Sequence, residues 1–82
     1  MTFDEIKEQE PAAGARVEAL RQAIKDAEGL DNHSLIAGLR SQFKAAIESH
    51  VAIFMEAINL PFEQYSEIVK AMEARRSTGV AA

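Results

Sequence analysis

The sequence contains no cysteine, no tryptophan and no long apolar run. Without cysteine, disulfides, iron–sulfur clusters, cysteine-based zinc sites and a cysteine nucleophile are all excluded. The longest apolar run, residues 51–55, is far too short to span a bilayer. The first residues have neither the basic flank nor the apolar segment of a signal peptide. We therefore expect a cytoplasmic protein with no membrane partner.

The apolar residues that are present can build only one small core. The chain has 82 residues, of which 48% are hydrophobic, but 15 of these are alanine. A domain of this size is marginally stable alone unless disulfides, a metal or a partner chain add to its stability. The length excludes a two-domain enzyme, and the composition predicts a single domain with a thin core.

Negative charge is concentrated at the start of the chain. The formal net charge is −4, and residues 1–10 hold four acidic residues against one lysine, a net charge of −3. The rest of the chain is nearly neutral and has no extended basic surface. This distribution argues against nonspecific binding to nucleic acid and favours a basic partner.

Capping and helix-breaking residues predict where the first helices begin and end. Thr2 and Glu5 have the spacing of a capping box, which favours a short acidic N-terminal helix or arm over residues 1–10. Pro11 is expected to end that segment, because the residue before a proline avoids the helical region. Pro11 also suits the first position of a new helix.

A single helical domain is predicted over residues 11–76. Its helices are expected at residues 11–28, 32–59 and 61–76. Gly29 stands where a left-handed C-terminal cap is expected, and the next turn offers three capping residues, Asp31, Asn32 and Ser34. Residues 77–82 are expected to form a disordered tail.

The central helix, residues 32–59, carries an apolar arc of about 160° at 100° per residue. Its two neighbours should be only about 24 to 27 Å long and too short to follow it from end to end. We therefore predict an all-α fold, a helical hairpin with a long central helix plus a third helix. This three-helix bundle-like protomer is expected to dimerise into a helical bundle. The alternative is a monomer whose central helix bends or breaks near Gly38 or Ser49.

The expected interface residues lie on the apolar arc of the central helix or on the apolar face of the last helix. They are Leu39, Phe43, Ile47, His50, Phe54, Phe62, Tyr65 and Met72. Aromatic residues and methionine are enriched in interface cores. The other interpretation is that Phe62, Val69 and Met72 close the protomer's own core against the central helix.

His50 is the one ionisable residue at the centre of this arc. It is interpreted as a hydrogen-bonded core histidine, with a pH switch or a metal ligand shared across a dimer as alternatives. The Glu-x-x-His spacing of di-iron helices fails, because residue 47 is isoleucine. No nucleophile elbow, phosphate loop or dinucleotide-binding motif occurs. We expect no catalysis and no cofactor.

The sequence thus predicts a non-catalytic protein–protein interaction module, a small regulatory adaptor or inhibitor that binds a larger protein machine. One alternative is a DNA-binding helical regulator, although the first turn of its recognition helix would be acidic. The phosphate contacts in that case would be Arg75, Arg76, Arg40 and Lys44. The other alternative is a helical metal-site protein that uses His50 across a dimer interface.

Overall fold

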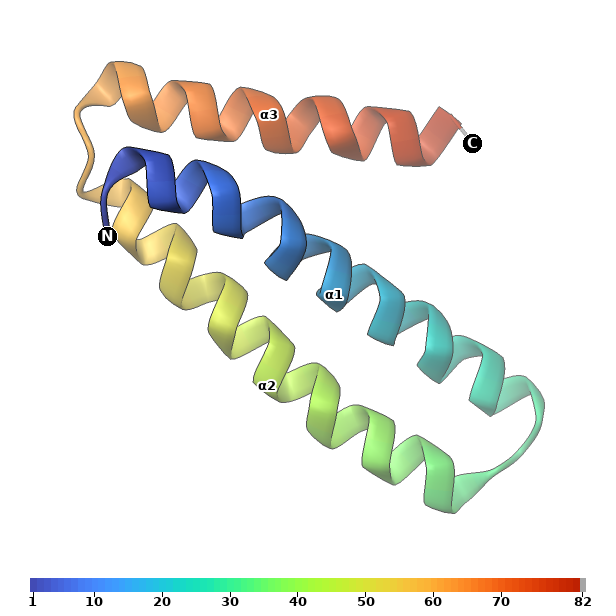
Figure 1. Ribbon diagram of the computed structural model, residues 1–82. Coiled ribbons are helices and arrows are strands. Elements are labelled where there is room, and N and C mark those ends of the chain that lie inside the picture. Colours follow the sequence, from blue (N-terminus) through green and yellow to red (C-terminus); the bar gives the residue numbers. More distant parts are fainter. Residues whose placement is uncertain (82) are drawn as a thin grey trace.

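The computed structural model describes the backbone of residues 1–81 and the side chains of residues 1–76. The described chain forms three helices and no strand: α1 is Phe3–Gly29, α2 is His33–Ile58 and α3 is Phe62–Ala81. Helices α1 and α2 form a long antiparallel hairpin, and α3 turns back from the end of α2 and runs in the direction of α1 (Figure 1). The predicted all-α hairpin with a third helix is confirmed.

The length and continuity of the helices bear on three of the expectations from the sequence. Among the described residues, no helix combines the length and the apolar character that crossing a membrane requires. Helix α2 is continuous through Gly38 and Ser49, so the break considered at either residue does not occur. Helix α3 extends to Ala81, so the helix end predicted at residue 76 is wrong, and of the tail predicted at residues 77–82 only residue 82 lies outside the described backbone.

The helix break expected at Pro11 is wrong, because α1 continues from Phe3 to Gly29 with Pro11 inside it. A proline in a helix interior removes one backbone hydrogen bond and crowds the carbonyl four residues earlier, at a cost of about 3 kcal/mol. The helix continues because buried residues on both sides of the proline hold it in place: Ile6 and Glu10 precede it and Gly14 follows it. Pro11 itself is exposed.

The continuous α1 changes how the helices cover one another. Its 27 residues make a helix of about 40 Å, against about 39 Å for the 26 residues of α2. Helix α1 therefore runs beside α2 along its whole length (Figure 1). The expectation that the first helix covers only the first part of α2 is wrong, because that helix was predicted to begin at residue 11.

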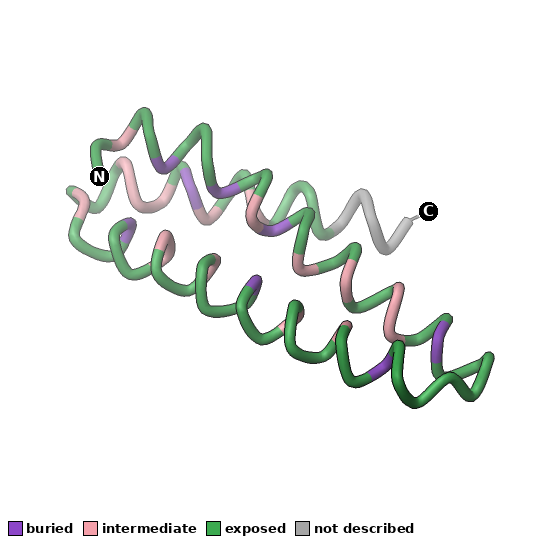
Figure 2. The backbone as a smooth tube through the Cα atoms, turned by 60° about the horizontal axis from the view of Figure 1, so that its bottom comes forward, coloured by how far each residue is buried: buried purple, intermediate pink, exposed green. Residues whose placement is uncertain are grey.

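The residues between α1 and α2 alternate at intervals of three and four positions, and we call them the seam. In α1 they are Phe3, Ile6, Glu10, Ala13, Val17, Leu20, Ile24 and Ala27. On the other side they are Ile36, Leu39, Phe43, Ala46, His50, Ile53 and Ala57 of α2, and Leu60, which follows the end of α2. All of them are buried or half-buried, whereas most of the remaining hairpin is exposed (Figure 2). This is the heptad spacing of an antiparallel coiled coil.

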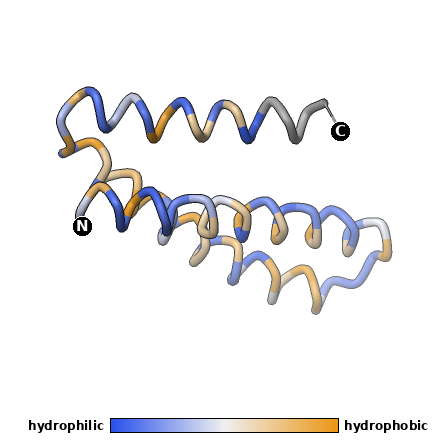
Figure 3. Tube along the Cα trace, turned by 45° about the horizontal axis from the view of Figure 1, so that its top comes forward, coloured by the Kyte–Doolittle hydropathy of each residue, from blue (hydrophilic) through white to orange (hydrophobic). Residues whose placement is uncertain are grey.

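Among the residues whose side chains are described, the apolar core shared by all three helices lies at one end of the hairpin. Ile6, Ala57 and Ile68, one residue from each helix, are fully or almost fully buried there. The side chains packed around them are Phe3, Ile53, Leu60, Tyr65 and Met72. Tyr65 also meets Phe54 edge to face, with ring centroids 6.1 Å apart. Beyond this end α3 diverges from the hairpin (Figures 1 and 3).

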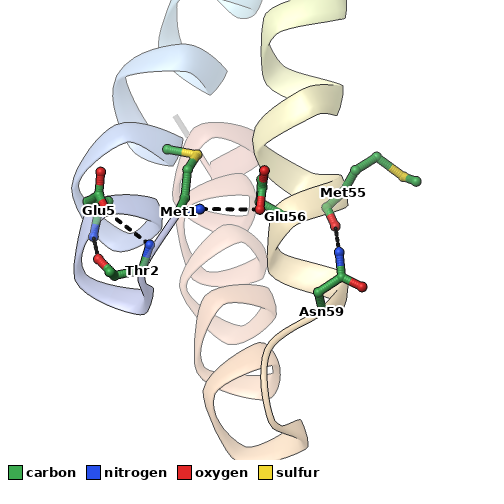
Figure 4. Close-up of polar contacts among 6 residues, drawn as sticks. All are labelled: Met1, Thr2, Glu5, Met55, Glu56 and Asn59. Carbon is green, nitrogen blue, oxygen red and sulfur yellow. Dashed lines mark hydrogen bonds and ion pairs between the residues drawn. The ribbon is translucent and has the colours of Figure 1, made fainter.

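Side-chain caps fix the start of α1. The predicted capping box is confirmed: Thr2 Oγ1 accepts the Glu5 N–H at 3.2 Å and Glu5 Oε1 accepts the Thr2 N–H at 3.0 Å (Figure 4). The hydrogen bond from the Thr2 backbone lowers the pKa of Glu5 below its ordinary value. At the same end, the amino group of Met1 pairs with Glu56 of α2 at 3.3 Å.

The turn between α1 and α2 places Asp31, and not Gly29, in the left-handed region. Asp31 has a φ of 55°, and no described glycine has a positive φ. The prediction for Gly29 is wrong because α1 includes Gly29, so the left-handed position after the helix falls two residues later. Aspartate tolerates this conformation better than most residues. Asn32 then caps α2 by accepting the Leu35 N–H at 3.1 Å.

Pro11→Ala should stabilise the protein. Alanine restores the backbone hydrogen bond that proline cannot donate, and it keeps a small apolar side chain at this exposed position. We expect the free energy of unfolding to rise by about 1–3 kcal/mol, as measured by urea denaturation at 25 °C. Ala12→Gly, an exposed change at the neighbouring position, should lower it by about 1 kcal/mol. A loss of stability in Pro11→Ala would contradict a continuous α1.

Candidate functional site

The divergence of α3 leaves a groove of about 1170 Å³ between α3 and the middle of the hairpin. Its apolar lining consists mainly of Val17, Phe54, Tyr65, Val69 and Met72. Its charged lining residues are Glu18, Arg21, Glu73, Arg75 and Arg76, and His50 also borders it. Four of the eight predicted interface residues therefore meet here: His50, Phe54, Tyr65 and Met72.

The other four predicted interface residues lie elsewhere. Leu39 and Phe43 are half-buried in the seam, and Ile47 is exposed on the outer side of α2. Phe62 is 78% exposed, so the interpretation that it closes the core is wrong. Phe62 does not belong to the residues of α3 that pack against the hairpin. Those residues are Tyr65, Ile68 and Met72.

A buried glutamate joins the three helices beside this groove. Glu10 of α1 is only 2% exposed. Its Oε2 contacts His50 Nε2 of α2 at 2.7 Å and accepts a hydrogen bond from Arg75 Nη2 of α3, also at 2.7 Å. Because an ionised carboxylate only accepts hydrogen bonds, His50 carries its proton on Nε2. The interpretation of His50 as a hydrogen-bonded core histidine is confirmed.

The two partners keep Glu10 ionised in spite of its burial. Burial alone raises the pKa of Glu10, because it disfavours the charged form. The hydrogen bonds and positive charge of Arg75 and His50 act in the opposite direction and outweigh it. The pKa of Glu10 therefore lies below its ordinary value of 4.5.

Gly14 provides the space for this cluster one turn further along α1. A Cβ at this position would lie 3.0 Å from Arg75 Nη2, 3.2 Å from Glu10 Oε2 and 3.5 Å from His50 Nε2. Glycine is unfavourable in a helix by about 1 kcal/mol relative to alanine. The close approach of the Arg75 guanidinium to α1 explains why a glycine fits here better than a larger residue.

Sequence reasoning identified His50 but missed its partner Glu10 and the second partner of that carboxylate, Arg75. Glu10 occupies a seam position, and Arg75 follows Met72 by three positions in the inward series of α3. The three- and four-residue spacing of each helix therefore indicates that both positions face inward. The inward position of Glu10 was missed because the predicted break at Pro11 assigned residue 10 to an acidic arm and not to the helix that packs on α2.

The described residues offer little for the two alternative functions. Among them, no three or more His, Cys, Asp or Glu side chains converge where a metal ion could sit. Arg75 binds Glu10, and Arg40 lies 4.0 Å from Glu28. Comparison of the chain with protein-family models, with curated proteins and with solved structures finds no match. The groove and the Glu10 cluster are thus the observations on which a function can be based.

Acid should destabilise the wild type more than Glu10→Gln. Because the pKa of Glu10 is lowered in the folded state, its contribution is complete above pH 4.5 and is lost as the pH falls through the folded-state pKa. Glutamine does not titrate, and it leaves the Arg75 guanidinium without its carboxylate partner. At pH 7 we expect Glu10→Gln to be less stable by about 2–3 kcal/mol, and the difference should shrink toward pH 3.

Urea unfolding at a series of pH values measures this difference. Glu8→Gln is the matched control, because Glu8 is an exposed glutamate of the same helix. The unfolding free energy of Glu8→Gln should depend on pH as that of the wild type does. Parallel curves for wild type and Glu10→Gln would show that Glu10 does not supply the acid sensitivity.

Gly14→Ala should destabilise the wild type but stabilise the Arg75→Ala variant. In the wild type the new methyl group lies 3.0 Å from Arg75 Nη2, so the guanidinium must shift by a few tenths of an ångström and its hydrogen bond to Glu10 is distorted. Without the guanidinium the closest contact is removed, and the higher helix propensity of alanine contributes up to about 1 kcal/mol. Unfolding free energies of the four proteins form a double-mutant cycle. If Gly14→Ala changed the unfolding free energy in the same direction in the wild type and in Arg75→Ala, a steric conflict with Arg75 would be excluded.

Proposed function

We propose that this protein is a non-catalytic interaction module that binds an amphipathic helix of another protein in the groove between α3 and the hairpin. The observation that carries the proposal is the groove itself, which three helices line with half-buried apolar side chains. Val17, Val69 and Met72 have no complete apolar cover on this side. A fourth helix placed there would bury them as the core of a four-helix bundle.

The size of the groove favours a helix over a small molecule. Small-molecule pockets are commonly about 300–1000 Å³ and enclose most of their ligand. This groove, at about 1170 Å³, is larger and opens to solvent along its length. An amphipathic helix fits such a site, because it inserts its apolar side chains and leaves its polar face in water.

The chemistry of the groove supports the same proposal. Methionine and aromatic side chains at Met72, Tyr65 and Phe54 are the types that anchor helices at interfaces. The charged residues at the groove are of both signs: Glu18 pairs with Arg21 at 2.8 Å, and Glu73 lies on the same helix as Arg76. Such a border suits the mixed polar face of a helix. By occupying a helix of a larger protein, the module would act as an adaptor or an inhibitor.

Site-specific photo-crosslinking in the cells that produce the protein tests this proposal. Ala15 lines the groove and is exposed, whereas Ala12 is equally exposed on α1 but does not line it. A benzophenone amino acid at position 15 should form an adduct with another protein, and the crosslinked peptide should be an amphipathic helix. The same group at position 12 should not form this adduct.

The substitution Ala15→Glu provides the second arm. It places a charged side chain at the groove without removing a core residue, and it should abolish crosslinking from a benzophenone at position 69. Ala12→Glu should leave that crosslink unchanged. Equal adducts from positions 12 and 15, or none from either, would overturn the proposed function.

A further inference from the structure

The chain exposes more surface than a compact monomer of its size. A folded protein of 9.0 kDa is expected to expose about 4900 Å² and to have a radius of gyration of about 12 Å. Here the accessible surface is 5899 Å² and the radius of gyration is 14.7 Å. The surplus of about 1000 Å² exceeds the roughly 800 Å² that each partner buries in a protein–protein interface of standard size.

Part of the surplus is a row of large apolar residues on the outer side of α2. We call the row the α2 stripe; its members are Ile47, Val51, Met55 and Ile58. They are 38 to 56% exposed. Their spacing of four, four and three positions confines them to an arc of about 80° on the helix. None of them lines the groove, so the α2 stripe is a separate surface.

We propose that the α2 stripe is the interface with a second copy of this chain, in which the two α2 helices pack antiparallel about a two-fold axis near residue 53. A two-fold interface brings one patch against itself, so the patch must be self-complementary. The α2 stripe has this property. In the antiparallel register, Ile47 of one copy lies opposite Ile58 of the other, and Val51 lies opposite Met55.

The charges around the α2 stripe also permit a second copy. Lys44, one turn before Ile47, and Glu48, next to it, are opposite in sign, and Arg40, about two turns before Ile47, lies 4.0 Å from Glu28. The excess negative charge of the chain is in residues 1–10, on α1. Two copies can therefore approach through α2 without placing like charges directly opposite one another.

The length and the apolar pattern of the α2 stripe favour a second copy of the chain over a short segment. The α2 stripe extends over about 16 Å of helix at 1.5 Å per residue, the length of three helical turns. A facing helix of the same length and apolar pattern covers it fully, and the second α2 provides both. The dimer is independent of the proposed function, because the α2 stripe and the groove share no residue.

Sedimentation equilibrium over a range of concentrations tests the dimer. The wild type should show a monomer–dimer equilibrium, and Val51→Glu should sediment as a monomer with unchanged helical circular dichroism. Ala45→Glu is the matched control: it adds the same charge at an exposed position about 120° around α2 from Val51 and should dimerise as the wild type does. A wild type that remains monomeric at every concentration would overturn the proposal.

Disulfide crosslinking tests the register, since the chain contains no cysteine of its own. A mixture of Val51→Cys and Met55→Cys should form the mixed disulfide dimer rapidly on mild oxidation. A mixture of Ala45→Cys and Val51→Cys should not. A dimer that survives Val51→Glu but is lost in Ala15→Glu would place the second copy in the groove. That result would overturn the α2 interface and leave helix binding by the groove supported.

Discussion

The buried carboxylate of Glu10 constrains the arrangement of all three helices. A carboxylate removed from water is costly unless charged partners and hydrogen bonds compensate it. His50 provides one partner only when α2 has the observed register against α1, and Arg75 provides the other only when α3 lies along the hairpin. Helix α3 also contacts the hairpin through the small core at one end and through the exposed pair of Lys7 and Glu67, which contributes at most about 1 kcal/mol.

The same constraint explains why the molecule has a groove. The side chain of Arg75 is long, so it reaches Glu10 while the backbone of α3 stays away from the hairpin, whereas Ile68 at the other end requires close packing. A helix held closely at one end and by a long side chain at the other diverges. Half of the fully buried apolar residues are alanines, at positions 27, 46 and 57. They let α1 and α2 approach closely, but they leave a core that a bound partner would stabilise substantially.

Local rules predicted most of the fold and little of the site. The capping box of Thr2 and Glu5, the turn near residue 32 and the three-and-four spacing of apolar residues are all short-range signals, and each of them was confirmed. Pro11 led to a wrong prediction, because the free-energy cost of a proline inside a helix is outweighed by tertiary packing on both sides of it. The pairing of Glu10 with Arg75 joins residues 65 positions apart. No local spacing specifies such a contact, nor the angle at which α3 leaves the hairpin.

The two proposed surfaces reinforce each other. Helix α2 contributes His50 and Phe54 to the groove on one side and the α2 stripe on another, so a single helix can join a second copy while the groove stays open. A two-fold dimer then presents two grooves. For a partner with two suitable helices, the second binding event becomes intramolecular and raises the apparent affinity by about 10²–10⁴ without any new contact. A small module with a thin core would gain from dimerisation both stability and bivalent binding.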